Sequence, residues 1–201
     1  MNKPVVAAFD FDGTLTRSDS FLPFLRMVVG DIRYVRQMLH LSPVLLGYGV
    51  GLVKNNEAKA RVLARFFAGQ DVKKIEQVAQ NFATRQLPAQ IRPAALARLF
   101  WHQQQGHRCV IVSASLECYL RPWAQTVGVT EIIGSRLTTD AGCYTGQLAG
   151  ANCYGAEKTR RLAELLGERD AYVLYAYGDS KGDRELLAMA DHAYFRQVPA
   201  L

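Results

Sequence analysis

Asp10-Phe11-Asp12-Gly13-Thr14-Leu15 is the stretch that decides how the fold and chemistry of this chain are interpreted. It follows the apolar run Val5–Phe9, which predicts a buried strand, and it opens a polar loop. Because Asp and Gly are ordinary turn residues, a plain turn after a strand is the simpler interpretation. Two carboxylates at a strand end could instead serve as nucleophile and metal ligand, or as nucleophile and acid/base. The Gly-Thr that follows suits a tight loop around a small anion, so we favour the functional interpretation.

Such a carboxylate pair suits phosphoryl transfer if other residues complete the site. Neighbouring carboxylates repel each other, and a bound cation is the usual remedy. Mg²⁺ fits a site with few protein carboxylates, because it keeps several waters and shares phosphate oxygens of the substrate. One aspartate could then attack phosphorus and form an aspartyl-phosphate. The second could protonate the leaving oxygen and later activate water.

Three further segments supply residues of the kind that this chemistry needs. Ser113-Ala114-Ser115 follows the strand-like His107–Val112, and Lys158 lies at the start of a helical stretch. Gly178-Asp179-Ser180-Lys181-Gly182-Asp183 follows the apolar run Ala171–Tyr177. Taken singly, these segments could be a helix cap, a solvated helix face and a loop. Together they lie at strand ends or at the start of the next helix, where ligands bind in open parallel sheets.

In this order the four segments resemble the signatures of the haloacid dehalogenase (HAD) superfamily of phosphatases, and together they cover essentially the whole chain. The resemblance implies that Asp10 is the nucleophile and a Mg²⁺ ligand, and that Asp12 is the acid/base with its backbone carbonyl on the metal. It implies that Asp179 is the third protein ligand and that Asp183 is a supporting acidic group. It implies phosphate-binding roles for Thr14, Ser113, Ala114 and Lys158.

The alternation of short apolar runs with helical patterns predicts an α/β fold, a Rossmann-like parallel sheet with helices on both faces. We expect strands at Val5–Phe9, Cys109–Ser113, Glu131–Ile133, Tyr172–Tyr177 and His192–Phe195. We expect helices at Leu116–Thr126, Glu157–Leu166 and Arg184–Ala190, and a β-hairpin formed by Ser135–Thr139 and Cys143–Leu148.

A long insertion of about residues 20–92 separates the first two motif segments and has a helical pattern throughout. Helices are expected at Asn56–Ala68 and Val72–Arg85, and Pro88 and Pro93 mark the return to the core. We therefore expect a catalytic core of residues 1–19 and 93–201 and an all-helical cap of residues 20–92. The family resemblance implies that the cap covers the active site and selects the substrate, as in the phosphoserine phosphatase-like branch, subfamily IB.

Two positions bear on the substrate. Asp19 falls where phosphoserine phosphatases have a glutamate that meets the amino group of the substrate, but Ser18-Asp19-Ser20 also resembles a helix cap, which we slightly favour. Gly182 stands where that branch has asparagine, and Ser113-Ala114-Ser115 departs from its Ser-Gly-Gly. The expected substrate is a small organic phosphate, phosphoserine-like or another amino-alcohol phosphate. The departures at Gly182 and Ser113-Ala114-Ser115 weaken the case for phosphoserine itself.

The segment Phe21–Val53 is unusually apolar. Its part Leu41–Val53 is too short and too interrupted by Pro and Gly for a membrane span. Because basic residues flank this segment, it could form an interfacial helix near anionic lipid. We favour the alternative that its apolar face packs on the cap or in a dimer contact. The alternatives to a metabolite phosphatase are a peripheral membrane lipid-phosphate phosphatase, phosphatidylglycerophosphatase-like, a phosphotransferase, and a non-catalytic phosphate-binding protein.

The composition is that of an ordinary globular protein, with 49% hydrophobic and 21% charged residues. The formal net charge of +6 fits an anionic substrate, and no Lys/Arg run is long enough to favour nucleic acid. The four cysteines show no paired metal-ligand spacing, so we expect free thiols in a cytoplasmic protein without zinc. The expected partner is a small phosphorylated metabolite, and the expected assembly is a monomer or homodimer.

Overall fold

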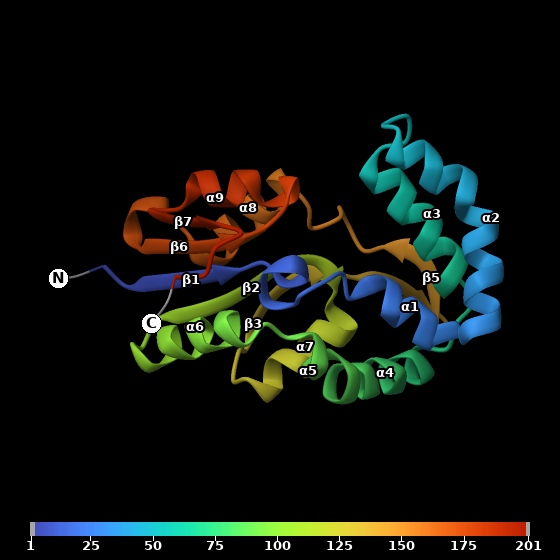
Figure 1. Ribbon diagram of the computed structural model, residues 1–201, viewed down its shortest axis with the longest axis horizontal. Helices are drawn as coiled ribbons and strands as arrows, with labels where there is room; N and C mark the ends of the chain where they lie inside the picture. Colours follow the sequence, from blue (N-terminus) through green and yellow to red (C-terminus); the bar gives the residue numbers. More distant parts are fainter. Residues whose placement is uncertain (1–2, 200–201) are drawn as a thin grey trace.

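The computed structural model of the protein describes residues 3–199 and contains a five-stranded parallel sheet (Figure 1). Its strand order is β3-β2-β1-β6-β7. The strands are β1 (Val5–Phe9), β2 (Arg108–Leu116), β3 (Glu131–Ser135), β6 (Val173–Gly178) and β7 (His192–Phe195). The five predicted strands are therefore present, and several extend one to three residues beyond their predicted ends.

The central strand β1 is buried on both faces, which explains its unbroken apolar sequence. Val6 and Ala8 face one apolar cluster, which includes residues of α8 (Ala156–Leu166) and α9 (Arg184–Met189). Ala7 and Phe9 face the other, which includes residues of α6 (Pro93–Gln104) and α7 (Glu117–Thr126). Figure 1 shows these helix pairs on opposite sides of the sheet. The predicted α/β fold with helices on both faces is confirmed.

The chain between β1 and β2 is helical. Before α6, its helices are α1 (Phe21–Val29), α2 (Asp31–Gly49), α3 (Asn55–Phe67), α4 (Val72–Asn81) and α5 (Leu87–Gln90). Short helical turns occur as η2 (Phe82–Gln86), η3 (Arg169–Ala171) and η4 (Lys181–Asp183). The loop after β1 forms a tight turn, η1 (Phe11–Leu15), whose backbone is not helical at Asp12 and Gly13. Gly30, with φ of 79°, separates α1 from α2. Within residues 3–199, no helix has both the length and the apolar character needed to cross a bilayer.

The predicted hairpin is present as β4 (Leu137–Asp140) and β5 (Cys143–Leu148). It packs against α3, and a Cβ on Gly146 would lie 2.7 Å from the Cα of Ala64. An isolated bridge joins Cys143 to Asp71, just before α4. Two strands from the range 93–201, which we expected to belong to the core, therefore pack with the helical insertion.

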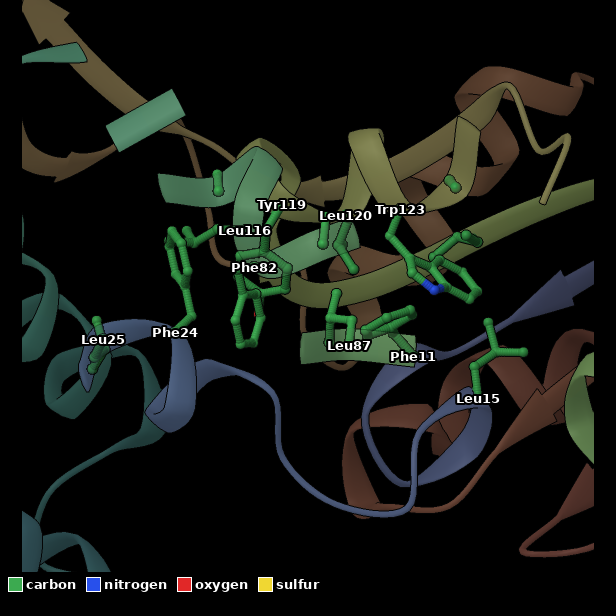
Figure 2. Close-up of a cluster of buried hydrophobic side chains, with 14 of the residues drawn as sticks. Phe11, Leu15, Phe24, Leu25, Phe82, Leu87, Leu116, Tyr119, Leu120 and Trp123 are labelled. Atoms are coloured by element: carbon green, nitrogen blue, oxygen red, sulfur yellow. The ribbon is translucent and has the colours of Figure 1, made fainter. Parts of the chain in front are cut away.

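Aromatic side chains join the base of the insertion to the core (Figure 2). The Phe24 ring of α1 lies 4.7 Å, centroid to centroid, from that of Tyr119 in α7, and Phe82 also contacts both rings. In the loop after β1, Phe11 meets Trp123 at 4.9 Å. Each fully buried aromatic side chain contributes about 1.5–3 kcal/mol. This cluster holds the loop that carries the first motif against α7.

Candidate active site

The strand order brings the predicted motif segments to one point of the sheet. From β1 the chain runs to β2 on one side, whereas β6 pairs on the other side, so the carboxyl ends of β1 and β6 form the topological switch point where ligands bind. Asp10 directly follows β1 and Asp179 directly follows β6. In β2 the pairing with β3 shifts between Val112 and Leu116, so the segment from Ser113 to Ser115 bulges out of the regular ladder.

A cavity of about 590 Å³ opens at this edge, between the sheet and the helical insertion. Most of the predicted site residues line it, namely Asp10, Asp12, Asp19, Ser113, Ala114, Lys158 and Asp179. Thr14 and Asp183 are buried beside these residues: the Thr14 hydroxyl lies 3.5 Å from Asp10 Oδ2. The structure therefore brings these predicted site residues together at one edge of the sheet.

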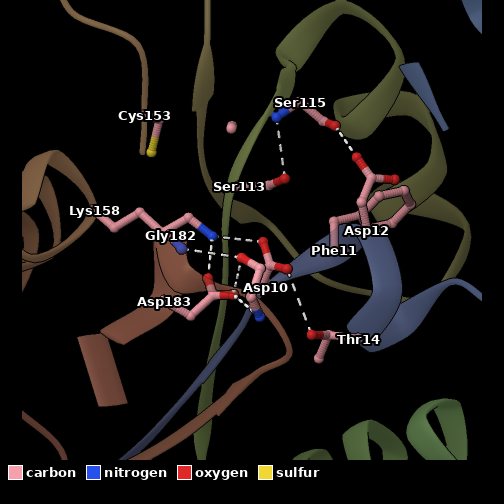
Figure 3. A network of polar contacts seen from close by, with 12 residues as sticks. Asp10, Phe11, Asp12, Thr14, Ser113, Ser115, Cys153, Lys158, Gly182 and Asp183 are labelled. Carbon is pink, nitrogen blue, oxygen red and sulfur yellow. Dashed lines mark hydrogen bonds and ion pairs between the residues drawn. The ribbon is translucent and has the colours of Figure 1, made fainter. Parts of the chain in front are cut away.

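Lys158 is buried between two carboxylates (Figure 3). Its Nζ donates to Asp10 Oδ1 at 2.6 Å and to Asp183 Oδ1 at 2.5 Å. Burial alone would lower the pKa of Lys158, but the two carboxylates outweigh burial and raise it. Burial raises the pKa of Asp10 to about 7, against the opposing effect of Lys158. One cation thus faces two carboxylates, which leaves the group with excess negative charge.

The carboxylates of Asp183 and Asp179 differ in their hydrogen-bond partners. Asp183 Oδ2 accepts hydrogen bonds from Asp179 N, Ser180 N and Ser180 Oγ, so this carboxylate holds the loop after β6. Asp179 Oδ1 is buried and has no hydrogen-bond partner within residues 3–199. Gly13, with φ of 78°, lies so close that a Cβ there would be 2.2 Å from Asp179 Oδ2. The loop therefore requires glycine and leaves an unpartnered oxygen facing the site.

These oxygens fit a hard cation. Carboxylate oxygens of Asp10, Asp179 and Asp183 lie within 4.8 Å of one another. The oxygen of Asp179 lacks a partner, and burial raises the pKa of Asp10 although Lys158 is paired with it, so a further cation would stabilise both carboxylates. Oxygen ligands in small number are the donor set that Mg²⁺ accepts.

Asp12 lies on the same loop but points its carboxylate away from this group. Oδ1 accepts from Ser20 N at 2.8 Å, and Oδ2 accepts from the Ser115 hydroxyl. Burial raises the pKa of Asp12 to about 6, while its hydrogen bonds to Ser115 and Ser20 act in the opposite direction. A carboxyl group with a pKa near neutrality can both give and take a proton.

Lys59, on α3, is a cavity residue that the sequence analysis missed. Its Nζ donates to the carbonyl of Ala114, to Asn152 Oδ1 at 2.6 Å and to Ser135 Oγ at 3.3 Å. Burial lowers its pKa to about 8, and Lys59 makes no ion pair with any residue in the described part of the chain. In the sequence, Lys59 was one of several basic residues between apolar helix positions, and no local signal distinguished it.

Asp19 and Gly182 are the two positions that we expected to influence the choice of substrate. Asp19 Oδ1 accepts from Leu22 N at 2.8 Å, which is a capping contact at the start of α1, and Asp19 also lines the cavity. A Cβ on Gly182 would lie 2.4 Å from the ring of Tyr154. Tyr154 lines the cavity and occupies the space that a larger residue at position 182 would need.

Residues 7–188 match the family described as haloacid dehalogenase-like hydrolase. The chain belongs to this family. "Protein CicA" of Caulobacter vibrioides is 39% identical over 203 residues, which cover 99% of this chain and 90% of that protein. "Probable phosphatase Rv3661" of Mycobacterium tuberculosis is 28% identical over 194 residues, covering 93% of this chain and 67% of that protein.

Solved structures support the fold of this HAD hydrolase. A protein of unknown function from Bordetella pertussis Tohama I superposes with a TM-score of 0.82 at 22% identity, covering 93% of this chain and 87% of that one. A substrate-bound phosphoserine phosphatase superposes with a TM-score of 0.65 at 15% identity, covering 97% of this chain and 87% of that one. The predicted family, fold and hydrolase class are confirmed, and subfamily IB is consistent with these neighbours.

Proposed function

We propose that this HAD hydrolase is a Mg²⁺-dependent phosphomonoesterase that works through an aspartyl-phosphate on Asp10. One observation carries the proposal: buried Asp10, paired with Lys158, shares the switch point of the sheet with the unpartnered oxygen of Asp179. Asp10 and Asp179, with the backbone carbonyl of Asp12, would hold the ion. Mg²⁺ bound there would neutralise charge on the phosphoryl group.

The remaining residues have separate tasks in the proposed reaction. The Ser113 hydroxyl, the Ala114 N–H and the Lys158 ammonium group would orient the phosphoryl oxygens. An oxygen of Asp10 attacks phosphorus while the bond from phosphorus to the leaving oxygen breaks, and Asp12 gives its proton to that oxygen. Asp12 then takes a proton from water as the water oxygen attacks phosphorus. The bond between phosphorus and Asp10 breaks, and inorganic phosphate leaves.

The substrate that we propose is a small organic phosphate, phosphoserine-like or another amino-alcohol phosphate. The carboxylate of Asp19 at the cavity supports this class, because it could pair with a substrate amine. The phosphoserine phosphatases among the structural neighbours support it at the level of the branch. The Tyr154 ring lies beside Gly182, so this part of the cavity differs from that of an enzyme with asparagine at this position. This difference argues against the same substrate as the phosphoserine phosphatases.

A lipid phosphate is the second candidate, because part of the cavity wall is apolar. Phe21 and Leu22 from α1, Leu45 from α2 and Val62 from α3 line it. Initial rates on phosphoserine, phosphoethanolamine and a short-chain lipid phosphate in mixed micelles would separate the two classes. A preference for the micellar substrate over both amino-alcohol phosphates would replace the first candidate by the second.

Phosphate release is the direct test of the reaction itself. We expect hydrolysis of at least one phosphomonoester in the presence of Mg²⁺, loss of activity with EDTA, and recovery when Mg²⁺ is added in excess. Asp10→Asn, which keeps the side-chain shape, should abolish turnover. Equal rates for wild type and Asp10→Asn, or full activity in EDTA, would refute the proposal.

A further inference from the structure

Helix α2 has apolar side chains on two faces, and only one of them is packed. On the inner face Leu41 is buried, and Tyr34, Met38 and Leu45 pack against the main apolar cluster. The outer face carries exposed side chains that we call the outer stripe: Ile32, Val35, Leu39 and Leu46, continued after the helix by Val50 and Leu52. Ile32 is 88% exposed and Leu52 is 84% exposed. We favoured packing on the cap or in a dimer for this segment, and packing on the insertion accounts for the inner face alone.

The outer stripe is one continuous surface. At about 100° per residue, Ile32, Val35, Leu39 and Leu46 fall within an arc of roughly 60° on the helix. Figure 1 shows α2 at the edge of the molecule farthest from the sheet, with α3 on its inner side. Single exposed apolar residues need no explanation, but a contiguous stripe of this kind marks an interaction site.

The charge around the outer stripe has one sign. Arg33 and Arg36 are exposed on the flank of the stripe, and Lys54 is exposed just beyond it. The sequence from Ile32 to Asn56 contains no aspartate or glutamate. At the two ends of this stretch, Asp31 is paired with Arg26, and Glu57 is paired with Arg61.

We propose that the outer stripe docks this protein onto an anionic membrane surface. The apolar side chains would enter the boundary between headgroups and acyl chains, while Arg33 and Arg36 would meet lipid phosphates. A second copy of the chain is a poorer fit. A symmetric contact would bring the arginines of both copies together, and the stripe supplies no carboxylate to face them.

Docking would also bring the active site close to the membrane. Leu45 and Tyr48 of α2 line the cavity, so the helix that carries the stripe also forms part of the cavity wall. The proposal does not rest on the proposed phosphatase reaction, because binding to vesicles is measured without turnover.

Vesicle flotation with the full chain tests the proposal. We expect the protein to float with vesicles of phosphatidylcholine and phosphatidylglycerol, to float poorly with phosphatidylcholine alone, and to bind less as salt is added. The Leu39→Ser/Leu46→Ser variant should lose roughly tenfold or more in vesicle affinity. Arg33→Gln/Arg36→Gln keeps the apolar stripe and should lose roughly tenfold on the anionic vesicles. Leu165→Ser, which changes an exposed leucine on α8, is the matched control and should bind as wild type does.

Wild-type protein that stays unbound with both kinds of vesicle would overturn the proposal. A wild-type dimer that the Leu39→Ser/Leu46→Ser variant converts to a monomer in sedimentation, without vesicle binding by either protein, would assign the stripe to a second copy. Binding that neither pair of substitutions changes would also overturn it, because another surface would then hold the lipid. The charge variant retains the apolar side chains, so it remains informative even if the serine variant folds poorly.

Discussion

Asp10→Asn should stabilise the metal-free protein, because the wild-type carboxylate is held where its charge is unfavourable. Asp10 is 5% exposed and lies beside Lys158 and Asp183, and burial raises its pKa to about 7 from an ordinary value of 3.8. The folded state binds the Asp10 proton more tightly than the unfolded state does. Protonation of Asp10 therefore stabilises the wild-type protein, and this contribution is fully present below about pH 4. It is lost as the pH rises through about 7.

The size of the effect follows from that shift. Roughly three pKa units correspond to about 4 kcal/mol, which is an upper bound for the cost of the charge above pH 7. The asparagine also removes one of the two carboxylate partners of Lys158, which offsets part of the gain. We therefore expect Asp10→Asn to raise the free energy of unfolding by about 1–3 kcal/mol near pH 8, with little difference near pH 4.

Urea unfolding in EDTA, followed by tryptophan fluorescence at several pH values, measures this difference. Added Mg²⁺ should reduce it, because a cation bound beside Asp10 and Asp179 stabilises the wild type more than the variant. Asp140→Asn, in the exposed hairpin strand β4, is the matched control and should change stability by less than about 0.5 kcal/mol. An Asp10→Asn variant that is no more stable than wild type near pH 8, or a difference independent of pH, would refute the reasoning.

Three further outcomes are expected. Lys59→Met should lower kcat/KM about tenfold or more, because the Ala114 carbonyl loses its hydrogen-bond donor. Arg61→Met, on the exposed side of α3, should leave kcat/KM unchanged. Equal effects of the two substitutions on kcat/KM would argue that Lys59 does not position the Ala114 segment. Gly182→Asn should lower kcat/KM by displacing the Tyr154 ring, and added Tyr154→Ala should restore part of it, whereas no recovery would argue against this clash. His102 is buried on α6, where its Nε2 lies 2.9 Å from the Tyr177 hydroxyl. Burial lowers the pKa of His102 to about 4, so the protein should lose up to about 3 kcal/mol of stability as the pH falls from about 6.5 to 4. A His102→Gln variant with the same pH slope in urea unfolding would contradict that origin.

Much of the site was predictable because many of its residues lie at the ends of neighbouring strands of one parallel sheet. An apolar run buried on both faces identifies a central strand, and the ends of such strands converge. The positions of Asp10, Ser113 and Asp179 follow from that rule together with their order in the chain. Lys158 required more, because a lone lysine on a helix is usually solvated, and only its place among the other motifs distinguished it.

Contacts between distant segments were not predictable. Lys59 reaches the Ala114 carbonyl and Asn152 across long separations in the chain, and nothing near Lys59 in the sequence signals these partners. The same holds for the hairpin, whose turn was evident locally while its packing on α3 was not. The two faces of α2 illustrate a further limit. Apolar residues on two faces of a helix suggest burial of both, yet within the described chain only the inner apolar face of α2 packs against the main apolar cluster.

The most direct test of the central claim is to trap the phosphorylated enzyme. Rapid quenching of a single turnover, followed by mass spectrometry of the proteolytic peptides, should find phosphate on the peptide that contains Asp10. The modification should require Mg²⁺ and be absent in Asp10→Asn. Substrate hydrolysed in a single turnover without phosphate on Asp10, or phosphate carried by another side chain, would contradict the account.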